Sequence, residues 1–483
     1  MAGDEYDELV VGAGVTGLTT ALLLARGARR VAVVTAEPVG GGSSGRSAGI
    51  VSQLHGSAYR RLAGETARRN AAAYRAMNAA GFDLIAELLA ESGTPHERRD
   101  AVLVALRPGG ARLIDDEHLA AHRAGLRLEK RQRLDLPFAH HGALRLPDQV
   151  LVDPGRLLTA LAVAARNAGA EIVERERVID VDVRRGHVRV ETGAGERSAA
   201  RLVLATGTPV LDRGLYALKT QPFRIMAVVG TTPDASLPMT TALGPGAVST
   251  TVATGADGRL VGIGAAHPVG TDGPESRHLA ALEAQVRGLV PGFERVGSWS
   301  GQDYRPFNPI AFVGALPRGL GSVTFATGYD GWGLTQGAAA GIRIAGDLLG
   351  RPRPRWATTI GRRVTRPPSM VIGARADLRA AATRVGSLRR IAPADLALLA
   401  DGQGLVHRTD EGAVATSLID GVVSSVTASC SRCGGRVAWN DVELGWDCPV
   451  CGSRFSPQGE VVEGAARGRL RPASGVPRDG SPI

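Results

Sequence analysis

The chain has 483 residues, of which 44% are hydrophobic, so it is long enough to bury a large core and to form two or three domains. Its formal net charge is +10, but only 4% of its residues are aromatic and no basic stripe with interleaved aromatic residues is present, which argues against a nucleic-acid partner. No apolar stretch is long enough to span a membrane, and a strand expected before residue 10 leaves no room for a signal peptide, so we expect a soluble, cytoplasmic protein with no membrane partner.

Residues 9–17 form a short apolar run that ends in three glycines at the spacing of a dinucleotide-binding turn. In such a turn Gly12 allows the tight bend, Gly14 lets the backbone approach a pyrophosphate, and Gly17 lets the next helix pack closely on the sheet. Apolar residues at helical spacing follow, and then the β-branched run 31–34. The pattern therefore predicts a βαβ unit that binds a dinucleotide.

One feature of this pattern is missing. The acidic residue expected at the end of the second strand, where it would hold ribose hydroxyls, is Thr35, and Glu37 follows two residues later. Either the adenosine end is held differently or Glu37 reaches back to it.

A loop of small residues spans positions 40–50. Its backbone N–H groups could wrap a phosphate or a flat ring, and a flexible linker is the alternative. A helical pattern then covers 66–92, and we assign its aromatic residues and its methionine to packing.

Two later strands also end in glycine, over 202–207 and 323–328, and the second leads into a small-residue helix that runs through Leu349. Together with the first turn they predict one sheet assembled from distant parts of the chain. The strand-rich residues between them suit an inserted substrate domain.

Five segments together resemble the D-amino-acid-oxidase-like family of FAD-dependent oxidoreductases: the glycine turn, and residues 43–49, 205–207, 299–306 and 328–335. The resemblance covers residues 8 to about 350. It implies an α/β fold, in which a Rossmann-like FAD-binding domain of the glutathione-reductase type carries an inserted antiparallel-sheet substrate domain. It also implies that the substrate is an amine or amino acid that loses a hydride to the flavin, and that molecular oxygen or another acceptor reoxidises the flavin.

Some relatives attach the flavin to a histidine or a cysteine. The matching loop position is Arg46 and no cysteine lies in this region, so we expect non-covalent FAD. The residues expected to bind it are Gly12, Gly14, Val15, Thr16, Gly17, Thr35, Ala36, Glu37, Ser43, Ser44, Gly45, Arg46, Ser47, Ala48, Gly49, Val178, Thr206, Gly207, Gly328, Gly331, Trp332, Gly333, Leu334 and Thr335.

The candidate catalytic residues fall into three groups. Arg224 and Arg305 could bind a substrate carboxylate, because a guanidinium binds it with two hydrogen bonds. His55 and His267 could act as bases. Tyr304, Tyr329 and Trp332 could form the walls of the pocket. For each arginine the alternative is a structural or surface role, and for each histidine it is an ordinary interior hydrogen bond.

All four cysteines lie in two CxxC pairs, Cys430 with Cys433 and Cys448 with Cys451, separated by fourteen residues. This spacing predicts one site with four thiolate ligands, of the kind that binds zinc or a single iron. We expect zinc, with mononuclear iron and an all-cysteine [2Fe-2S] cluster as the alternatives.

The residues around the second pair, 446–464, resemble the second half of a Rieske iron–sulfur domain, which is fused behind some flavoproteins of this family. A Rieske cluster takes a cysteine and a histidine from each loop, but Arg432 and Cys451 stand at the histidine positions. We therefore expect a small all-β, Rieske-like or zinc-ribbon-like domain with a structural metal. Two alternatives stay open: electrons pass from the flavin through iron in this domain, or a zinc ribbon binds nucleic acid or protein while the flavin is vestigial.

The expected domains are an FAD-binding domain (1–90, 150–210 and 310–350), a substrate domain (91–149 and 211–309), an Arg/Pro-rich linker (351–395), a metal domain (396–470) and a disordered tail (471–483).

Overall fold

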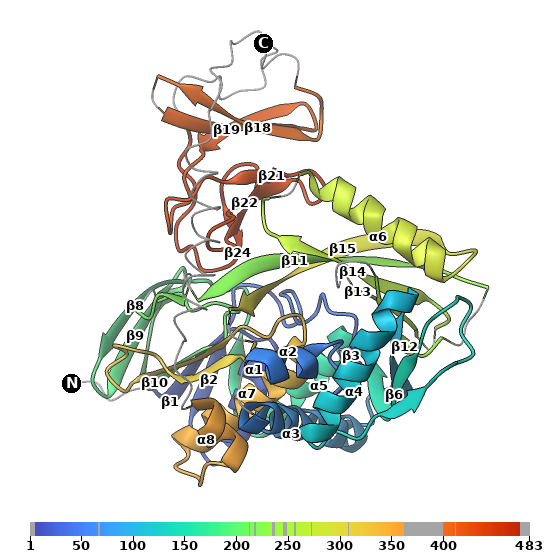
Figure 1. Cartoon of the computed structure of the whole chain (residues 1–483). Helices are drawn as coiled ribbons and strands as arrows, with labels where there is room; N and C mark the ends of the chain where they lie inside the picture. Colours follow the sequence, from blue (N-terminus) through green and yellow to red (C-terminus); the bar gives the residue numbers. More distant parts are fainter. Residues whose placement is uncertain are drawn as a thin grey trace.

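The computed structural model describes residues 5–65, 68–211, 213–216, 219–233, 237–244, 249–255, 257–271, 273–307, 309–361, 399–410 and 412–473. They form two large β-sheets with their helices and a C-terminal domain of two small sheets (Figure 1). The expected linker is described only to residue 361 and the expected tail only to residue 473, and the rest of both segments lies outside the described residues.

The first sheet has eight strands, and five of them, β7, β2, β1, β10 and β17, lie side by side in parallel. Val10 of β1 pairs with Val33 on one side and with Val203 on the other, so the glycine-containing strand ends meet at one edge, as the sequence predicted. The strands are β1 (Tyr6–Val11), β2 (Val31–Val34), β7 (Glu171–Val173), β8 (Val178–Arg184), β9 (His187–Thr192), β10 (Gly195–Leu204), β16 (Phe312–Ala315) and β17 (Val323–Thr327).

Helices cover one face of this sheet and the β8–β9 hairpin pairs with β10 beside it. The last long helix has small residues because it packs closely against the first helix. A Cβ added at Gly341 would lie 2.8 Å from the Cβ of Thr19 in the first helix. The helices are α1 (Val15–Arg26), α3 (Arg68–Ser92), α5 (Pro154–Asn167), α7 (Gly333–Leu348) and α8 (Arg355–Gly361).

The second sheet has nine strands and forms the expected inserted domain. It is antiparallel except for one pair, β4 with β12, which run in parallel. These two strands come from separate excursions of the chain and share no hairpin, so nothing forces them to run in opposite directions. The strands are β3 (Ile50–Val51), β4 (His96–Ala105), β5 (Glu129–Arg131), β6 (Ala143–Val152), β11 (Thr220–Thr231), β12 (Met239–Leu243), β13 (Ser249–Thr254), β14 (Leu260–Pro268) and β15 (Glu294–Pro306).

Helix α6 (Glu275–Leu289) covers the outer face of the second sheet, where Leu282 and Val286 pack with Met226 and Val228 of β11. At the other end of the sheet the chain forms α2 (Ala58–Glu65), η1 (Pro108–Gly110) and α4 (Ala111–Arg123).

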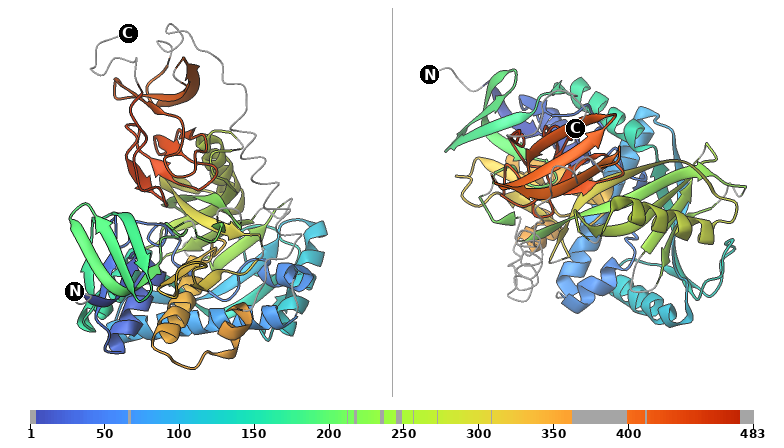
Figure 2. Two further views of the ribbon diagram at one scale, coloured as in Figure 1. Left: turned by 90° about the vertical axis from the view of Figure 1, so that its left-hand side faces the viewer. Right: turned by 90° about the horizontal axis from the view of Figure 1, so that it is seen from above.

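The C-terminal domain contains a three-stranded and a four-stranded antiparallel sheet, which agrees with the expected small all-β domain. Its core joins Trp446, Phe455 and Leu470 to three of the cysteines. It lies over β11 and β15, with β24 nearest the first sheet (Figures 1 and 2). The strands are β18 (Gln403–Thr409), β19 (Gly412–Ile419), β20 (Val422–Thr427), β21 (Ala438–Asn440), β22 (Gly445–Asp447), β23 (Arg454–Phe455) and β24 (Val461–Glu463).

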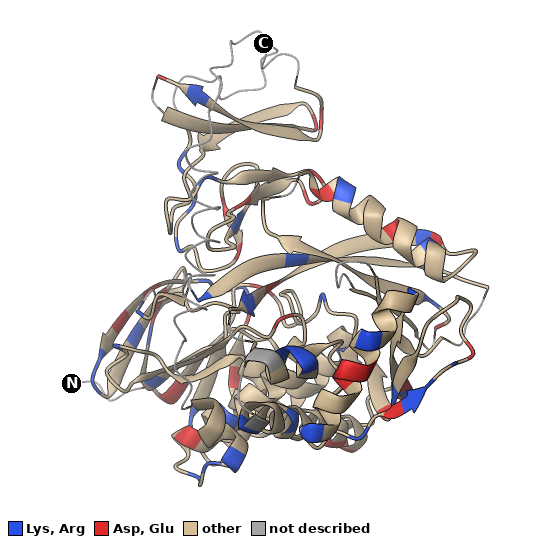
Figure 3. Cartoon of the chain, viewed as in Figure 1, with Lys and Arg blue, Asp and Glu red and all other residues tan. Residues whose placement is uncertain are grey.

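Lysine and arginine residues are spread over all parts of the cartoon, with aspartate and glutamate among them (Figure 3). Among the described helices, none has both the length and the apolar character needed to cross a membrane.

Candidate functional site

A cavity of about 390 Å³ lies at the carboxyl ends of β1, β2 and β10, where ligands bind in open α/β sheets. The small-residue loop, the strands β11, β14 and β15, and the turn before α7 form its other walls. Nineteen of the residues expected to bind the cofactor line it: Gly12, Gly14, Val15, Thr16, Thr35, Ala36, Glu37, Ser43, Ser44, Arg46, Ser47, Ala48, Val178, Thr206, Gly207, Gly331, Trp332, Gly333 and Leu334.

The glycine turn has the shape that a pyrophosphate requires. Gly12 has a φ of +106°, and a Cβ there would lie 2.5 Å from the carbonyl oxygen of Ala205. Helix α1 begins at the cavity wall, its N-cap residue Gly14 has no side chain and its first turn has no acidic residue, so the N–H groups after Val15 and the helix dipole can face an anion. The Val15 N–H donates to Ser44 Oγ (3.2 Å), which joins the turn to the small-residue loop. The turn therefore fits a dinucleotide.

At the adenosine end, Thr35 continues the backbone pairing, because its N–H donates to the Val173 carbonyl (3.0 Å). Glu37 lies on the cavity rim, 3.8 Å from Arg177. Glu176 also lines the cavity, and its N–H donates to the Thr35 carbonyl (2.8 Å), so two carboxylates, Glu37 and Glu176, lie at this end.

Five expected cofactor residues do not line the cavity: Gly17, Gly45, Gly49, Gly328 and Thr335. For three of them the reason is backbone packing, because a Cβ at Gly17, Gly45 or Gly49 would lie within 2 Å of a carbonyl oxygen. Thr335 donates to the Ser52 carbonyl (3.0 Å). These residues shape the site from behind its walls.

His55 is buried and outside the cavity lining, so the structure does not support it as a base. Its ring nitrogens lie 2.7 Å from Tyr74 Oη and 2.7 Å from the Ser52 carbonyl, and burial lowers its pKa to about 3. The ring stacks on Trp332 at 4.5 Å between centroids. His55 therefore supports a wall residue of the cavity.

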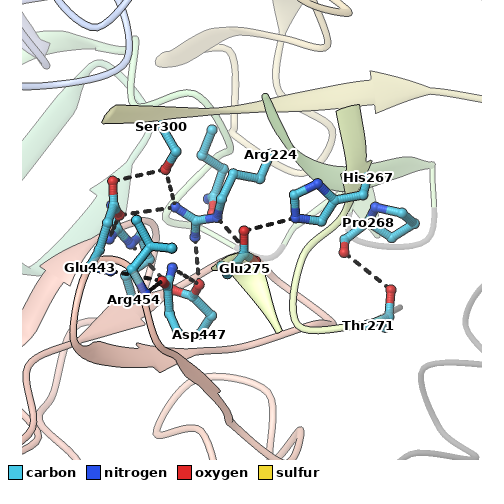
Figure 4. A network of polar contacts seen from close by, with 12 residues as sticks. Arg224, His267, Pro268, Thr271, Glu275, Ser300, Glu443, Asp447 and Arg454 are labelled. Atoms are coloured by element: carbon cyan, nitrogen blue, oxygen red, sulfur yellow. Dashed lines mark hydrogen bonds and ion pairs between the residues drawn. The ribbon is translucent and has the colours of Figure 1, made fainter. Parts of the chain in front are cut away.

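Arg224 and His267 are also placed differently from the expectation, because both are buried outside the cavity lining (Figure 4). Arg224 forms ion pairs with Asp447 (2.6 Å), Glu443 (3.2 Å) and Glu275 (3.7 Å). His267 Nε2 lies 2.9 Å from Glu275. A guanidinium that is already matched to internal carboxylates is not free to bind a substrate, so Arg224 holds domains together instead.

Arg305, Tyr304 and Tyr329 do line the cavity. Arg305 is partly exposed and its Nε bonds Asp330 (2.7 Å). The hydroxyl of Tyr329 lies 2.7 Å from Thr16 Oγ1, at the start of α1. The Tyr304 hydroxyl donates to the Cys451 carbonyl (3.3 Å), which places this side chain between the cavity and the C-terminal domain.

The sequence reasoning missed Asp303, which lines the cavity two residues before Arg305. Its carboxylate accepts N–H bonds from Gly331 (2.6 Å) and Tyr304 (2.7 Å). Burial raises its pKa to about 7, although the two N–H groups favour the charged form and act to lower the pKa. The alternation of a strand could have identified Asp303, because residues i and i+2 share a face.

The sequence reasoning also missed a C-terminal segment, Val462–Ala466, of which Val462, Glu463, Gly464 and Ala466 line the cavity. No local sequence pattern marks these residues as part of a cofactor site.

The four cysteines come together as predicted, with all four sulfur atoms within 4.8 Å of one another. Cys430 Sγ lies 3.7 Å from Cys451 Sγ, and Cys433 Sγ lies 3.4 Å from Cys448 Sγ. The two turns match: the N–H groups of Gly434 and Gly452 donate to the carbonyls of Cys430 (2.9 Å) and Cys448 (2.8 Å). A tetrahedral metal with bonds of about 2.3 Å to sulfur needs sulfur atoms about 3.8 Å apart, so the donor set fits one ion.

Comparison with known proteins shows similarity along nearly the whole chain. A putative Rieske 2Fe-2S iron-sulfur protein of Bacillus subtilis is 26% identical over 476 residues, which cover 96% of this chain and 92% of that protein. A glycine oxidase of Bacillus licheniformis is 25% identical over 373 residues, which cover 73% of this chain and 95% of the relative.

Among solved structures, the glycine oxidase from Geobacillus kaustophilus matches with a TM-score of 0.60 at 22% identity, over 72% of this chain and 95% of that chain. The L-proline dehydrogenase from P. horikoshii matches with a TM-score of 0.61 at 18% identity, over the same two shares. These structures share the fold of the two large sheets. Residues 7–346 match the family model described as FAD dependent oxidoreductase (DAO), and the chain therefore belongs to this family of FAD-dependent enzymes.

Proposed function

We propose that the protein removes a hydride from the carbon next to the nitrogen of an amino acid or a similar amine, with non-covalent FAD as the hydride acceptor. The observation that carries this proposal is the pair of opposite charges, Asp303 and Arg305, on the cavity wall. The similarity to glycine oxidase supports an amino-acid-like substrate.

Asp303 and Arg305 lie two residues apart on β15, on the same side of the strand. Their contacts confirm this placement, because Asp303 bonds the Gly331 N–H and Arg305 bonds the neighbouring Asp330. Two residues of a strand span about 7 Å, a distance that a bound zwitterion can bridge. The ion pair of Arg305 with Asp330 uses Nε, so the two terminal nitrogens remain for a substrate carboxylate and Asp303 for the ammonium group.

FAD, when bound, supplies the hydride acceptor. The chain's own residues then provide orientation: Arg305 and Asp303 fix the two ends of the substrate, and Trp332, backed by His55, forms an apolar wall. Holding the reacting carbon in place in a site screened from water supplies a large part of such a rate enhancement. The first turn of α1, with Ser44, would hold the pyrophosphate.

The residues of this region support non-covalent binding. The loop position used for attachment in some relatives is Arg46, and all four cysteines of the chain lie at 430–451. His55, the histidine nearest in sequence to the loop, does not line the cavity and has both ring nitrogens engaged.

For the four-cysteine site we propose one zinc ion with a structural role. In an all-cysteine [2Fe-2S] cluster the second iron separates the two sulfur pairs by more than about 5 Å, whereas here all sulfur atoms lie within 4.8 Å. Zinc and mononuclear iron share this geometry, and zinc is the common structural ion in Cys₄ sites.

One observation favours a second function, in which electrons leave the flavin through iron in this domain. Tyr304 contacts both parts: its hydroxyl bonds the Cys451 carbonyl, and its ring lies 3.4 Å from where a Cβ of Gly207 would stand on the cavity wall.

Two measurements on the purified protein test these proposals. Anaerobic mixing with a panel of amino acids and amines should bleach the flavin absorbance with at least one of them, and a yellow protein that no compound in the panel bleaches would contradict the amine chemistry. Metal analysis should give one zinc per chain, whereas one iron per chain would favour the second function.

A further inference from the structure

The C-terminal domain forms part of the cavity wall, although it lies more than a hundred residues beyond the last segment of the first sheet. The segment Val462–Ala466, called the closing turn here, lines the cavity together with the glycine turn and the small-residue loop.

The closing turn bonds directly to residues expected to contact the cofactor. Ser43 Oγ donates to Glu463 (3.1 Å), and Arg46 lies 3.6 Å from the same carboxylate. On the adenosine side, Arg177 donates to the Val462 carbonyl (2.9 Å). The closing turn therefore contacts both the small-residue loop and Arg177.

The second cysteine pair holds the closing turn from behind. The Ala466 N–H donates to Ser453 Oγ (3.0 Å), and the Cys451 thiol lies 3.2 Å from the same oxygen. A Cβ at Gly464, whose φ is +92°, would lie 2.8 Å from the Cα of Ser453, so the two segments pack without space between them. The segment Cys448–Ser453 thus packs directly against the back of the closing turn.

Buried charges hold the whole domain in place (Figure 4). Arg224 of β11 is completely buried and pairs with Asp447 and Glu443 of the C-terminal domain. Arg454 pairs with the same two carboxylates and with Glu463 of the closing turn (3.1 Å). Separating these groups would leave charges without partners, so the domain is docked firmly rather than tethered loosely.

We propose that the closing turn is part of the FAD site and that the metal of the four-cysteine site controls FAD retention by holding this turn against the cavity. This inference rests on the proposed function, because it requires that FAD binds in the cavity. The connection between the two sites would run through Ser453, which bonds Ala466 of the closing turn and lies beside Cys451.

The first test removes the metal from the flavin-loaded protein with a zinc chelator and measures flavin release by fluorescence. We expect the dissociation constant for FAD to rise at least tenfold and to return when zinc is added back. An unchanged dissociation constant in protein shown to be metal-free would overturn the inference.

The second test uses a variant that keeps the metal ligands. Glu463→Gln weakens the contacts to Ser43, Arg46 and Arg454, and should raise the dissociation constant for FAD about fivefold at full metal content. The matched control is Glu460→Gln, an exposed glutamate three residues earlier that pairs with Arg469 (3.0 Å) outside the cavity lining, and it should leave FAD binding unchanged. Equal FAD binding by the two variants would refute the role of the closing turn.

The outcomes separate this inference from the proposed function. A wild-type protein that binds zinc but no FAD would refute both. A protein that binds FAD and oxidises an amine, yet keeps FAD equally tightly without metal, would refute only the inference.

Discussion

Replacing Arg224 by methionine should loosen the contact between the C-terminal domain and β11, with no direct effect on substrate binding. The guanidinium is completely buried, and its partner Asp447 is 2% exposed. The substitution takes one of two arginines from Asp447 and Glu443 and leaves Glu275 paired with His267. Breaking a buried ion pair from one side costs about 3–5 kcal/mol. Arg454 still pairs with both Asp447 and Glu443, so we expect the lower end, about 3 kcal/mol, which is about a 100-fold change in the opening equilibrium.

Hydrogen exchange measures this opening locally. Peptides that cover β22 and the second cysteine pair should exchange about 100-fold faster in Arg224→Met, while peptides from α1 and β2 should change little. The control is Arg295→Met on β15, whose ion pair with Glu283 is partly exposed and therefore worth about 0–1 kcal/mol. If Arg224→Met leaves exchange unchanged and raises KM instead, Arg224 binds substrate and our assignment is wrong.

Three further predictions concern the two sites. Because burial raises the pKa of Asp303 to about 7, this group is mostly neutral below that pH and charged above it, so kcat/KM for an amino acid should rise as pH increases through about 7. Asp303→Asn should lose that rise, and an unchanged profile would rule out its role at the ammonium group. Arg305→Ala should raise KM for amino acids at least tenfold and have a smaller effect on amines without a carboxylate; equal effects would argue against a carboxylate ligand. Cys433→Ser should lower metal content below half, and full metal content would contradict the four-thiolate site.

Features set by local chemistry were predictable from the sequence. The spacing of Gly12, Gly14 and Gly17 predicted a turn whose physical basis is the steric conflict that a Cβ would cause at Gly12 and Gly17. The two CxxC pairs predicted one metal site, because each pair forms the same short turn whatever surrounds it. In both cases the information lies within a few neighbouring residues.

The roles of the arginines were not predictable in this way. Arg224 and Arg305 lie on neighbouring strands and have the same chemistry, but Arg305 pairs with Asp330 and Arg224 with Asp447 of the C-terminal domain. Asp447 lies more than two hundred residues after Arg224, so only the docked fold shows that this guanidinium is neutralised internally. A sequence motif therefore identifies a residue suited to bind a carboxylate without showing which carboxylate it binds.

Strand β15 shows which features of the site the sequence predicts and which it does not. Its side chains alternate between the cavity side and the C-terminal domain. On the cavity side, Trp299 donates to the Arg46 carbonyl (2.8 Å) and Asp303 accepts from the Gly331 N–H. On the other side, Ser300 bonds Glu443 (2.8 Å) and Gln302 bonds the Gly452 carbonyl (2.6 Å). The period of two was readable from the sequence, and it separates these residues into two faces. The sequence did not show which part of the molecule covers each face. The C-terminal domain has its own core and metal ligands, so its sequence pattern describes that domain and not its contact with β15. Strand β15 thus forms a wall of the cavity on one face and the docking surface of the C-terminal domain on the other. We therefore expect loss of the metal to weaken FAD binding.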